Sequence, residues 1–218
     1  MEARLHLSKS STCKPVDPTM YRSIIGSLRY LTHTRPDITY AVGIVSRYME
    51  KPAADHLAAV KRILRYIKGT LNLGCFYGRE EGMTMQLCGY SDSDHGGDVD
   101  DRKSTSGVLF YLNSSPAMWL SRLLASLTGD EADQVTLKVD NQSAIALSKN
   151  PVHHERSKHI DIKYHYVREC VKNGTIAVEY VRTVDQLADV LTKPLGKLKF
   201  LELRDRIGMR TLEQILQG

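Results

Sequence analysis

Apolar residues recur every three or four positions between Thr19 and Lys68, which is the spacing of a helix with one buried face. The pattern predicts three helices, which begin near Thr19, at Pro36 and at Pro52. Proline is favoured in the first turn of a helix, because the N–H group that it lacks has no partner there. The third helix is expected to reach Lys68 and to end at Gly69.

From Leu71 onward the chain changes to short apolar and β-branched runs separated by turn residues, a pattern typical of strands. We expect strands at residues 74–77, 85–90, 107–112, 135–139 and 175–181. Helical spacing returns at residues 142–149, 160–172, 184–191 and 197–217. This alternation predicts an α/β fold, preceded by a small and mainly α-helical part.

One junction in this pattern is abrupt. Strand-like sequence at 107–112 gives way to helical spacing within a few residues of Trp119, the single tryptophan. The helical spacing consists of leucines at positions 120, 123, 124 and 127. The two patterns have almost no turn residues of their own between them, which raises the question whether a segment is missing.

Length and composition fit an ordinary globular protein of one large domain or two small ones. The chain has 218 residues, of which 42% are hydrophobic and 25% charged. No apolar run approaches the roughly 20 residues of a membrane span, and the N-terminus lacks the apolar core of a signal peptide. The four cysteines lie far apart, as expected of reduced thiols. We therefore expect an intracellular protein, in the cytoplasm or nucleus, without membrane contact.

The positive charge is concentrated in the first part of the chain. Residues 1–83 carry 13 Lys and Arg against 7 Asp and Glu, whereas residues 84–218 carry 17 against 18. Four basic residues share the outer face of the helix predicted from Pro52, where they could follow a row of phosphates: Lys61, Arg62, Arg65 and Lys68. A solvated helix face without a ligand explains this pattern about as well.

Three aspartates are candidates for a metal site. Asp92 and Asp140 each follow a predicted strand, and Asp189 lies on a late predicted helix. If the two strands are parallel neighbours, both carboxylates lie at the same sheet edge, where α/β proteins commonly bind ligands. Clustered carboxylates repel one another, and hard divalent ions neutralise them. An aspartate after a strand is also a common turn or cap residue, so each could be structural.

Long stretches of the chain resemble the C-terminal end of copia-type retrotransposon polyproteins. The similar stretches are MYRSIIGSLRYLTHTRPDITYAVGIVSRYM, HLAAVKRILRYIKGT, GYSDSDHGGDVDDRKSTSG, VDNQSAIALSKNPVHHERSKHIDIKYHYVRE and QLADVLTKPL. The resemblance implies that residues 1–83 derive from the thumb or connection end of a reverse transcriptase. Residues 84–196 would be an incomplete RNase H-like domain, with a mixed sheet flanked by helices, and residues 197–218 a helical tail.

The resemblance also implies roles for particular residues. Asp92, Asp140 and Asp189 match the family's catalytic carboxylates, which bind Mg²⁺ or Mn²⁺ and cleave the RNA strand of RNA–DNA hybrids. Asn141 and Gln142 match residues that touch the hybrid. The hydroxyl residues that open the second strand, near the path of the hybrid, are Ser104, Thr105 and Ser106.

The chain departs from the family at the second acidic ligand, a glutamate in a serine-threonine-glutamate-alanine-glutamate-tyrosine type segment that is missing here. Trp119 then marks a deletion joint, where a strand opening meets a helix ending. Glu131 is the nearest acid, but the predicted strand alone separates it from Asp140 by roughly 17 Å. Ligands of a two-metal site must surround ions only about 4 Å apart.

We therefore expect a degenerate protein that binds nucleic acid and has lost hybrid cleavage. One alternative is an active hybrid ribonuclease with a rewired site. The other is a module reused for protein contacts. The sequence alone leaves both open.

Overall fold

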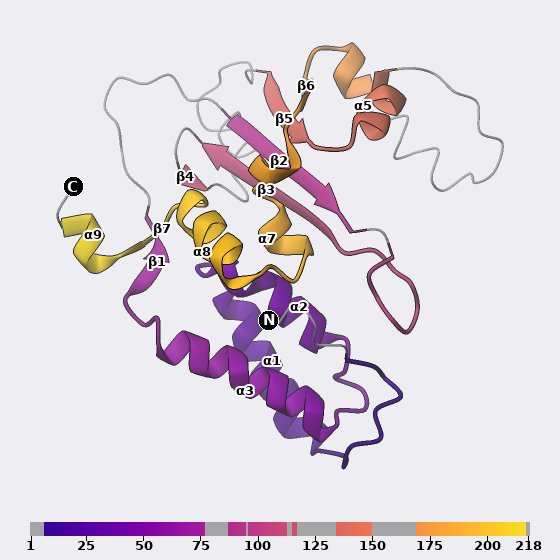
Figure 1. The fold of residues 1–218 in the computed structure, drawn as a ribbon, viewed down its shortest axis with the longest axis vertical. Helices are drawn as coiled ribbons and strands as arrows, with labels where there is room; N and C mark the ends of the chain where they lie inside the picture. The colour runs from indigo at the N-terminus through magenta and orange to yellow at the C-terminus, as the bar shows by residue number, and fades with distance from the viewer. Residues whose placement is uncertain are drawn as a thin grey trace. The chain divides into compact units, whose positions relative to one another are not determined.

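The computed structural model describes residues 7–76, 87–94, 96–112, 115–116, 134–149 and 169–216. Its chain forms two compact units. The first unit combines Met1–Phe76, Ser93–Gly107 and Asp189–Gly218, and the second combines Tyr77–Asp92 and Val108–Ala188. Each unit is therefore assembled from segments that are far apart in the sequence, as the colours of Figure 1 show.

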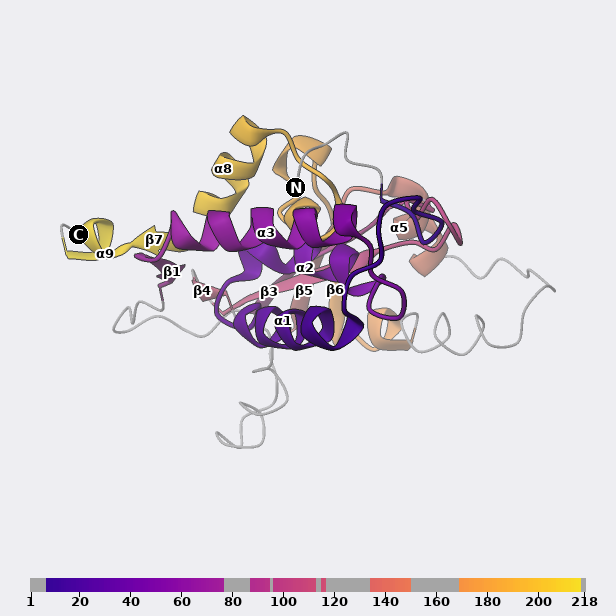
Figure 2. The same cartoon turned by 90° about the horizontal axis from the view of Figure 1, so that it is seen from below.

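Three helices form the core of the first unit: α1 (Pro18–Leu31), α2 (Thr39–Ser46) and α3 (Ala54–Lys68). Helix α2 contacts both α1 and α3 (Figure 2). Asp17 begins α1, because its carboxylate accepts hydrogen bonds from the backbone N–H groups of Thr19 at 2.9 Å and Met20 at 3.4 Å. The three predicted helices are confirmed.

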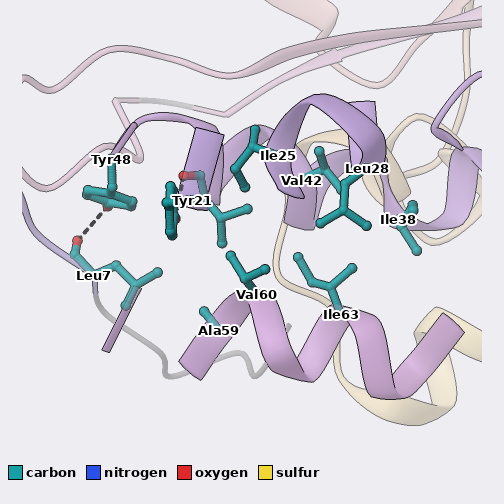
Figure 3. Packing of buried hydrophobic residues seen from close by; sticks show 11 residues of the cluster. Leu7, Tyr21, Ile25, Leu28, Ile38, Val42, Tyr48, Ala59, Val60 and Ile63 are labelled. Atoms are coloured by element: carbon teal, nitrogen blue, oxygen red, sulfur yellow. Dashed lines mark hydrogen bonds between the residues drawn. The ribbon is translucent and has the colours of Figure 1, made fainter. Parts of the chain in front are cut away.

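The buried faces of these helices meet in one apolar cluster (Figure 3). Its members include Tyr21, Ile25, Leu28, Ile38, Val42, Val45, Tyr48, Ala59, Val60 and Ile63. Two tyrosines in the cluster satisfy their hydroxyl groups on backbone carbonyls. Tyr21 donates to the carbonyl of Val45 at 2.8 Å, and Tyr48 donates to that of Leu7 at 2.9 Å. The second bond ties the N-terminal segment to the helices.

The helix expected from Pro36 begins as a 3₁₀ turn, η1 (Pro36–Ile38), before α2 starts at Thr39. The reason is a buried ion pair within this turn. The guanidinium of Arg35 donates to both carboxylate oxygens of Asp37, at 2.9 and 2.8 Å, and also to the Thr70 carbonyl at 3.0 Å. These bonds fix the turn against the end of α3.

The C-terminal part of the first unit differs from the predicted helical tail. It contains α7 (Asp189–Thr192), α8 (Lys197–Arg206), β7 (Met209–Thr211) and α9 (Leu212–Leu216). Strand β7 pairs antiparallel with β1 (Leu73–Cys75), which corresponds to the strand predicted at 74–77. A continuous helix over 197–217 was therefore wrong, because long-range pairing makes 209–211 a strand.

The helix predicted at 184–191 is confirmed only from Asp189 onward. A 3₁₀ turn, η2 (Thr183–Asp185), is followed by an extended Gln186, and α7 begins only at Asp189. Gln186 is fully buried in the second unit. Its amide donates to the Ser91 carbonyl at 3.0 Å and its oxygen accepts from the Ala188 N–H at 3.2 Å, which interrupts the helix.

In its described residues, the second unit is built on a five-stranded mixed sheet with the order β4-β3-β2-β5-β6. Its strands are β2 (Leu87–Ser93), β3 (Ser106–Leu112), β4 (Ser115–Pro116), β5 (Val135–Val139) and β6 (Ile176–Tyr180). Strand β5 pairs parallel with both β2 and β6, whereas β3 and β4 are antiparallel. Helix α5 (Gln142–Lys149) follows β5. The expected α/β class with a mixed sheet is confirmed.

Several predictions concern residues outside the described part of the chain. Trp119, the leucines that follow it and Glu131 all lie there, so the deletion joint stays a prediction. Only 169–172 of the helix predicted at 160–172 is described, and it is helical.

No helix within the described ranges is both long and apolar enough to cross a membrane.

Candidate metal centre and nucleic-acid interface

Two of the three candidate carboxylates lie at neighbouring parallel strands of the second unit. Ser91 of β2 is aligned with Val139 of β5, so Asp92 within β2 and Asp140 directly after β5 occupy the next position along each chain segment. The two residues are half-buried and offer carboxylate oxygens within 4.8 Å of one another. Asp92 lies inside β2, which extends to Ser93, and not after the strand as the sequence suggested. The predicted meeting of these two carboxylates at one sheet edge is confirmed.

Hydrogen bonds to the backbone immediately before each aspartate hold this edge. The carbonyl of Ser91 accepts from the Gln186 side chain at 3.0 Å. The carbonyl of Val139 accepts from the Val181 N–H at 3.0 Å. The two carboxylates therefore start from fixed backbone positions, which lowers the entropic cost of binding a cation.

Glycine is required within β2 for the packing of the sheet. A Cβ atom on Gly89 would lie 2.8 Å from the ring of Phe110 and 3.0 Å from the Leu137 side chain. Since real Cβ atoms do not approach that closely, a side chain at 89 would displace these neighbours. Gly89 thus allows β2 and β5 to share the apolar layer that supports the carboxylate edge.

Asp189, the third candidate, belongs to the first unit and begins α7. It is buried, and its carboxylate forms an ion pair of 2.7 Å with the Lys193 ammonium one turn later. Gly107 lets α7 approach, because a Cβ there would lie 2.7 Å from the Cβ of Leu191. In the chain, Asp189 directly follows Ala188, the last residue of the second unit. Its role as a third ligand stays a prediction.

The donor atoms of the carboxylate pair fit a hard divalent cation. Mg²⁺ and Ca²⁺ prefer carboxylate, carbonyl and water oxygens, and Mn²⁺ accepts the same ligands. Asp92 and Asp140 supply only carboxylate oxygens from their side chains. The pair is thus chemically suited to the Mg²⁺ or Mn²⁺ that the family resemblance implies for the ancestral site.

The three predicted hydroxyl contacts lie in the segment 93–107 of the first unit. Ser104 accepts from the Gly96 N–H at 3.0 Å, and the Thr105 hydroxyl accepts from the Arg47 guanidinium at 2.7 Å. The hydroxyl of Ser106 lies 3.0 Å from that of Ser93. Ser104 and Ser106 therefore hold the segment 93–107 and are exposed as well, whereas Thr105 ties this segment to Arg47 at the end of α2.

Asn141 and Gln142 are both exposed at the start of α5. The Asn141 side-chain oxygen accepts from the Ala144 N–H at 3.1 Å, which is the hydrogen bond of a helix N-cap. Sequence reasoning treated Asn141 only as a hybrid contact. The capping role has a sequence signal, because asparagine directly before a helical pattern is a strong N-cap residue.

The basic residues predicted for α3 are all exposed: Lys61, Arg62, Arg65 and Lys68. Lys61, Arg65 and Lys68 follow one another at helical intervals of four and three, which places them along one face. The basic face predicted on this helix is present, and its binding of phosphates stays a prediction.

Two structural features of these sites were missed by sequence reasoning. Gln186 was treated as part of a helix, although its side chain holds the carbonyl before Asp92. A pocket beside α3 that includes Phe200 of α8 was not anticipated, because it joins residues that are far apart in the sequence. Neither feature has a local sequence signal.

The fold and the carboxylate pair define an α/β protein with a mixed sheet and a candidate cation site at the ends of two parallel strands. No protein-family model matches the chain. It is 42% identical over 232 aligned positions to the retrovirus-related Pol polyprotein from transposon RE1 of Arabidopsis thaliana. It is 37% identical over 220 positions to the corresponding polyprotein from transposon TNT 1-94 of Nicotiana tabacum. These matches cover 93% and 88% of this chain and 16% of each polyprotein.

A third relative, the secreted RxLR effector protein 161 of Plasmopara viticola, is 39% identical over 131 positions. That match covers 59% of this chain and 91% of the effector protein. The chain is thus homologous to one segment of retrovirus-related Pol polyproteins from transposons, and it belongs to the family of sequences that share this segment. It spans about one sixth of the length of the two polyproteins.

Proposed function

We propose that this chain is a retrotransposon-derived remnant of a copia-type Pol polyprotein that binds nucleic acid and no longer cleaves RNA–DNA hybrids. Its second unit would be an RNase H-like domain, and its first helices would come from the end of a reverse transcriptase. The observation that carries the proposal is the position of Asp92 and Asp140 at adjacent ends of parallel strands, with oxygens within 4.8 Å. The Pol homologues support it.

Asp92, Asp140 and Asp189 are the residues that would hold Mg²⁺ or Mn²⁺. A pair of such ions, when bound, activates water and stabilises the leaving oxygen in phosphodiester hydrolysis. The contribution of the chain is to orient the carboxylates. Hydrogen bonds to backbone carbonyls, from the Gln186 side chain and from the Val181 N–H, hold the residues before Asp92 and Asp140, and Lys193 neutralises Asp189.

The expected loss of cleavage rests on the missing second acidic ligand. The chain contains no segment that matches the glutamate-bearing start of the family's first long helix. Removing one member of a group that acts as a unit commonly costs orders of magnitude in rate. Binding through phosphate contacts does not depend on that ligand, so it can survive when cleavage is lost.

The basic face of α3 is the proposed nucleic-acid contact. Its four Lys and Arg residues are exposed. When such residues contact phosphates, counterions are released from the nucleic acid, and this release favours binding. Such contacts are independent of base sequence, so we expect this face to contribute to the binding of both hybrids and single strands.

A cleavage assay tests the catalytic part of the proposal. A labelled RNA–DNA hybrid is incubated with the full chain in Mg²⁺ or Mn²⁺. We expect no more cleavage than with Asp140→Asn. The matched control is Asp205→Asn, which changes an exposed aspartate of α8 that pairs with Arg210. Cleavage by the wild-type chain that Asp140→Asn abolishes and Asp205→Asn preserves would show a rewired, active nuclease.

Manganese binding tests the carboxylate pair separately from cleavage. Electron paramagnetic resonance of free Mn²⁺ should show binding to the wild-type chain and to Asp205→Asn, with weaker binding to Asp140→Asn. Equal binding by all three proteins would place the cation elsewhere and contradict the proposed site. Failure to bind any hybrid at low salt would favour a protein-contact module.

A further inference from the structure

The first unit contains a pocket between α2, α3 and α8 that the carboxylate site and the basic face do not explain. Its apolar lining consists of Ile38, Ala41, Ala59, Ile63, Tyr66 and Phe200. The hollow measures about 130 Å³. An apolar cavity of about 150 Å³ is known to hold one benzene ring, so this space matches a single six-membered ring.

The aromatic wall of the pocket is held in place before any ligand binds. The rings of Tyr66 and Phe200 meet edge to face, with centroids 5.8 Å apart. The Tyr66 hydroxyl donates to the Asp37 carboxylate at 2.6 Å and accepts from Arg204 of α8 at 3.1 Å. Arg35 fixes Asp37 in turn. Pre-organised walls of this kind reduce the entropic cost of binding a flat ring.

Two charged residues also line the pocket, Asp37 and Arg62 of α3. Arg35 neutralises Asp37 in a buried ion pair of 2.8 Å, whereas Arg62 has the exposed Lys61 and Arg65 beside it on the same helix, so positive charge is in excess at the border. An apolar hollow with cations beside it complements a ligand that joins a flat ring to a negative charge. A nucleotide has both parts, because its base stacks on aromatic side chains while its phosphate contacts Lys and Arg.

We propose that this pocket takes one pyrimidine base of a single-stranded nucleic acid whose phosphates follow the basic face of α3. The inference rests on the nucleic-acid binding proposed above and adds a site for the base. A purine has two fused rings and exceeds the space that holds one. The pocket therefore favours pyrimidine-rich single strands by shape and stacking, whereas double strands keep their bases inside the helix and contact only the basic face.

Fluorescence anisotropy with three labelled DNA strands of equal length tests the pocket. The strands are oligothymidine, oligoadenosine and an abasic strand with the same number of phosphates. Because stacking of one base contributes about 1–3 kcal/mol, we expect oligothymidine to bind roughly 5- to 150-fold more tightly than the abasic strand. Oligoadenosine should resemble the abasic strand.

Substitutions within the pocket should remove this preference. Ala41→Leu fills the hollow, and Phe200→Leu keeps an apolar side chain but removes the ring. Both should bind oligothymidine only as well as the abasic strand, whereas Phe200→Tyr should behave like the wild-type chain. Ala58→Leu is the matched control, since Ala58 is an exposed residue of α3. Thermal melting establishes that each variant is folded.

The outcomes separate the two proposals. Equal affinity of the wild-type chain for oligothymidine and the abasic strand would overturn the base pocket but leave nucleic-acid binding intact. A thymidine preference that survives in both Ala41→Leu and Phe200→Leu would also overturn it. Failure to bind any of the three strands at low salt would overturn both proposals.

Discussion

Buried polar side chains of the first unit form hydrogen bonds with specific partners. His56 is fully buried, and its Nδ1 accepts from the Ala53 N–H at 3.0 Å. Its Nε2 therefore carries the proton and donates to the Ser8 carbonyl at 3.0 Å. Its ring stacks on Tyr48 with centroids 4.0 Å apart. These bonds attach the N-terminal segment to α3. Because the polar groups are buried, losing one of these hydrogen bonds costs more stability than losing a hydrogen bond at the surface.

Tyr48 should make the stability of the protein fall in alkali. Burial, with added repulsion from Asp100 and Asp98, raises the pKa of Tyr48 from its usual value of 10.0 to about 12. The folded state therefore holds this proton more tightly than the unfolded state does. Its stabilising contribution is complete below pH 10 and is lost as the pH rises to 12, by about 2 kcal/mol. Urea denaturation at pH 9, 10, 11 and 12 measures this loss.

Tyr48→Phe should make that pH dependence shallower. It should not abolish it, because burial raises the pKa of Tyr21 in the same direction. Tyr30→Phe is the control, since Tyr30 is 82% exposed. An unchanged slope in Tyr48→Phe would contradict the assignment.

Cys75 should react slowly with thiol reagents. Burial, with a contribution from Asp37, raises the pKa of the Cys75 thiol from 9.0 to about 11. Because the thiolate is the reactive form, alkylation by iodoacetamide at pH 8 should be about 100-fold slower than for a thiol with the usual pKa. Mass spectrometry over time compares Cys75 with the exposed Cys13 of the same chain. Equal rates at the two residues would show that Cys75 is accessible.

At the scale of elements, side chains at helix starts decide where the chain becomes helical. Asp17 caps α1 through two hydrogen bonds to backbone N–H groups. Asp17→Ala should lower the free energy of unfolding by about 1 kcal/mol, because it leaves these donors without that acceptor. Asp17→Asn preserves the acceptor and should cost much less. Urea denaturation of both variants checks the prediction, which equal losses would contradict.

Local pattern predicted those elements whose partners are close in the sequence or whose apolar face is regular. Strand β5 and helix α5 have the expected bounds, and α3 ends at Lys68 as expected. Strand β7 could not be predicted in this way, because its three residues become a strand only by pairing with β1. The helix expected at 184–191 begins only at Asp189, because Gln186 hydrogen-bonds to β2.

In the candidate sites too, features with a local sequence pattern could be predicted, and features made by long-range contacts could not. The meeting of Asp92 and Asp140 could be predicted, since strand ends are visible in the sequence and parallel neighbours share an edge. The exposed row on α3 could be predicted from helical spacing. The pocket at Phe200 could not, because its lining is brought together by tertiary packing alone.

For the whole molecule, an uneven distribution of charge should govern binding to polyanions. The net charge is +5, and the excess lies in residues 1–83. Binding to an RNA–DNA hybrid should weaken linearly on a log–log plot against salt. Replacing Lys61, Arg65 and Lys68 by alanine should reduce the slope by about 3, because each of these side chains is expected to neutralise one phosphate.

The matched control removes the same charge elsewhere in the first unit. Lys9, Lys14 and Lys51 are exposed and lie outside α3. Their replacement by alanine should leave the slope nearly unchanged. If both triple variants reduce the slope equally, the chain binds through its overall charge, and α3 has no special part.

The pairing of β1 with β7 has a consequence for the order of events during synthesis. Leu73 is aligned with Thr211, so the ribosome must add well over a hundred residues before β1 meets its partner. At about 5–20 residues per second this takes on the order of ten seconds. Over that interval α1, α2 and α3 are already available to fold, while the edge of β1 has no strand to pair with. Unpaired edges recruit other strands, so the newly made chain is most open to misassembly then.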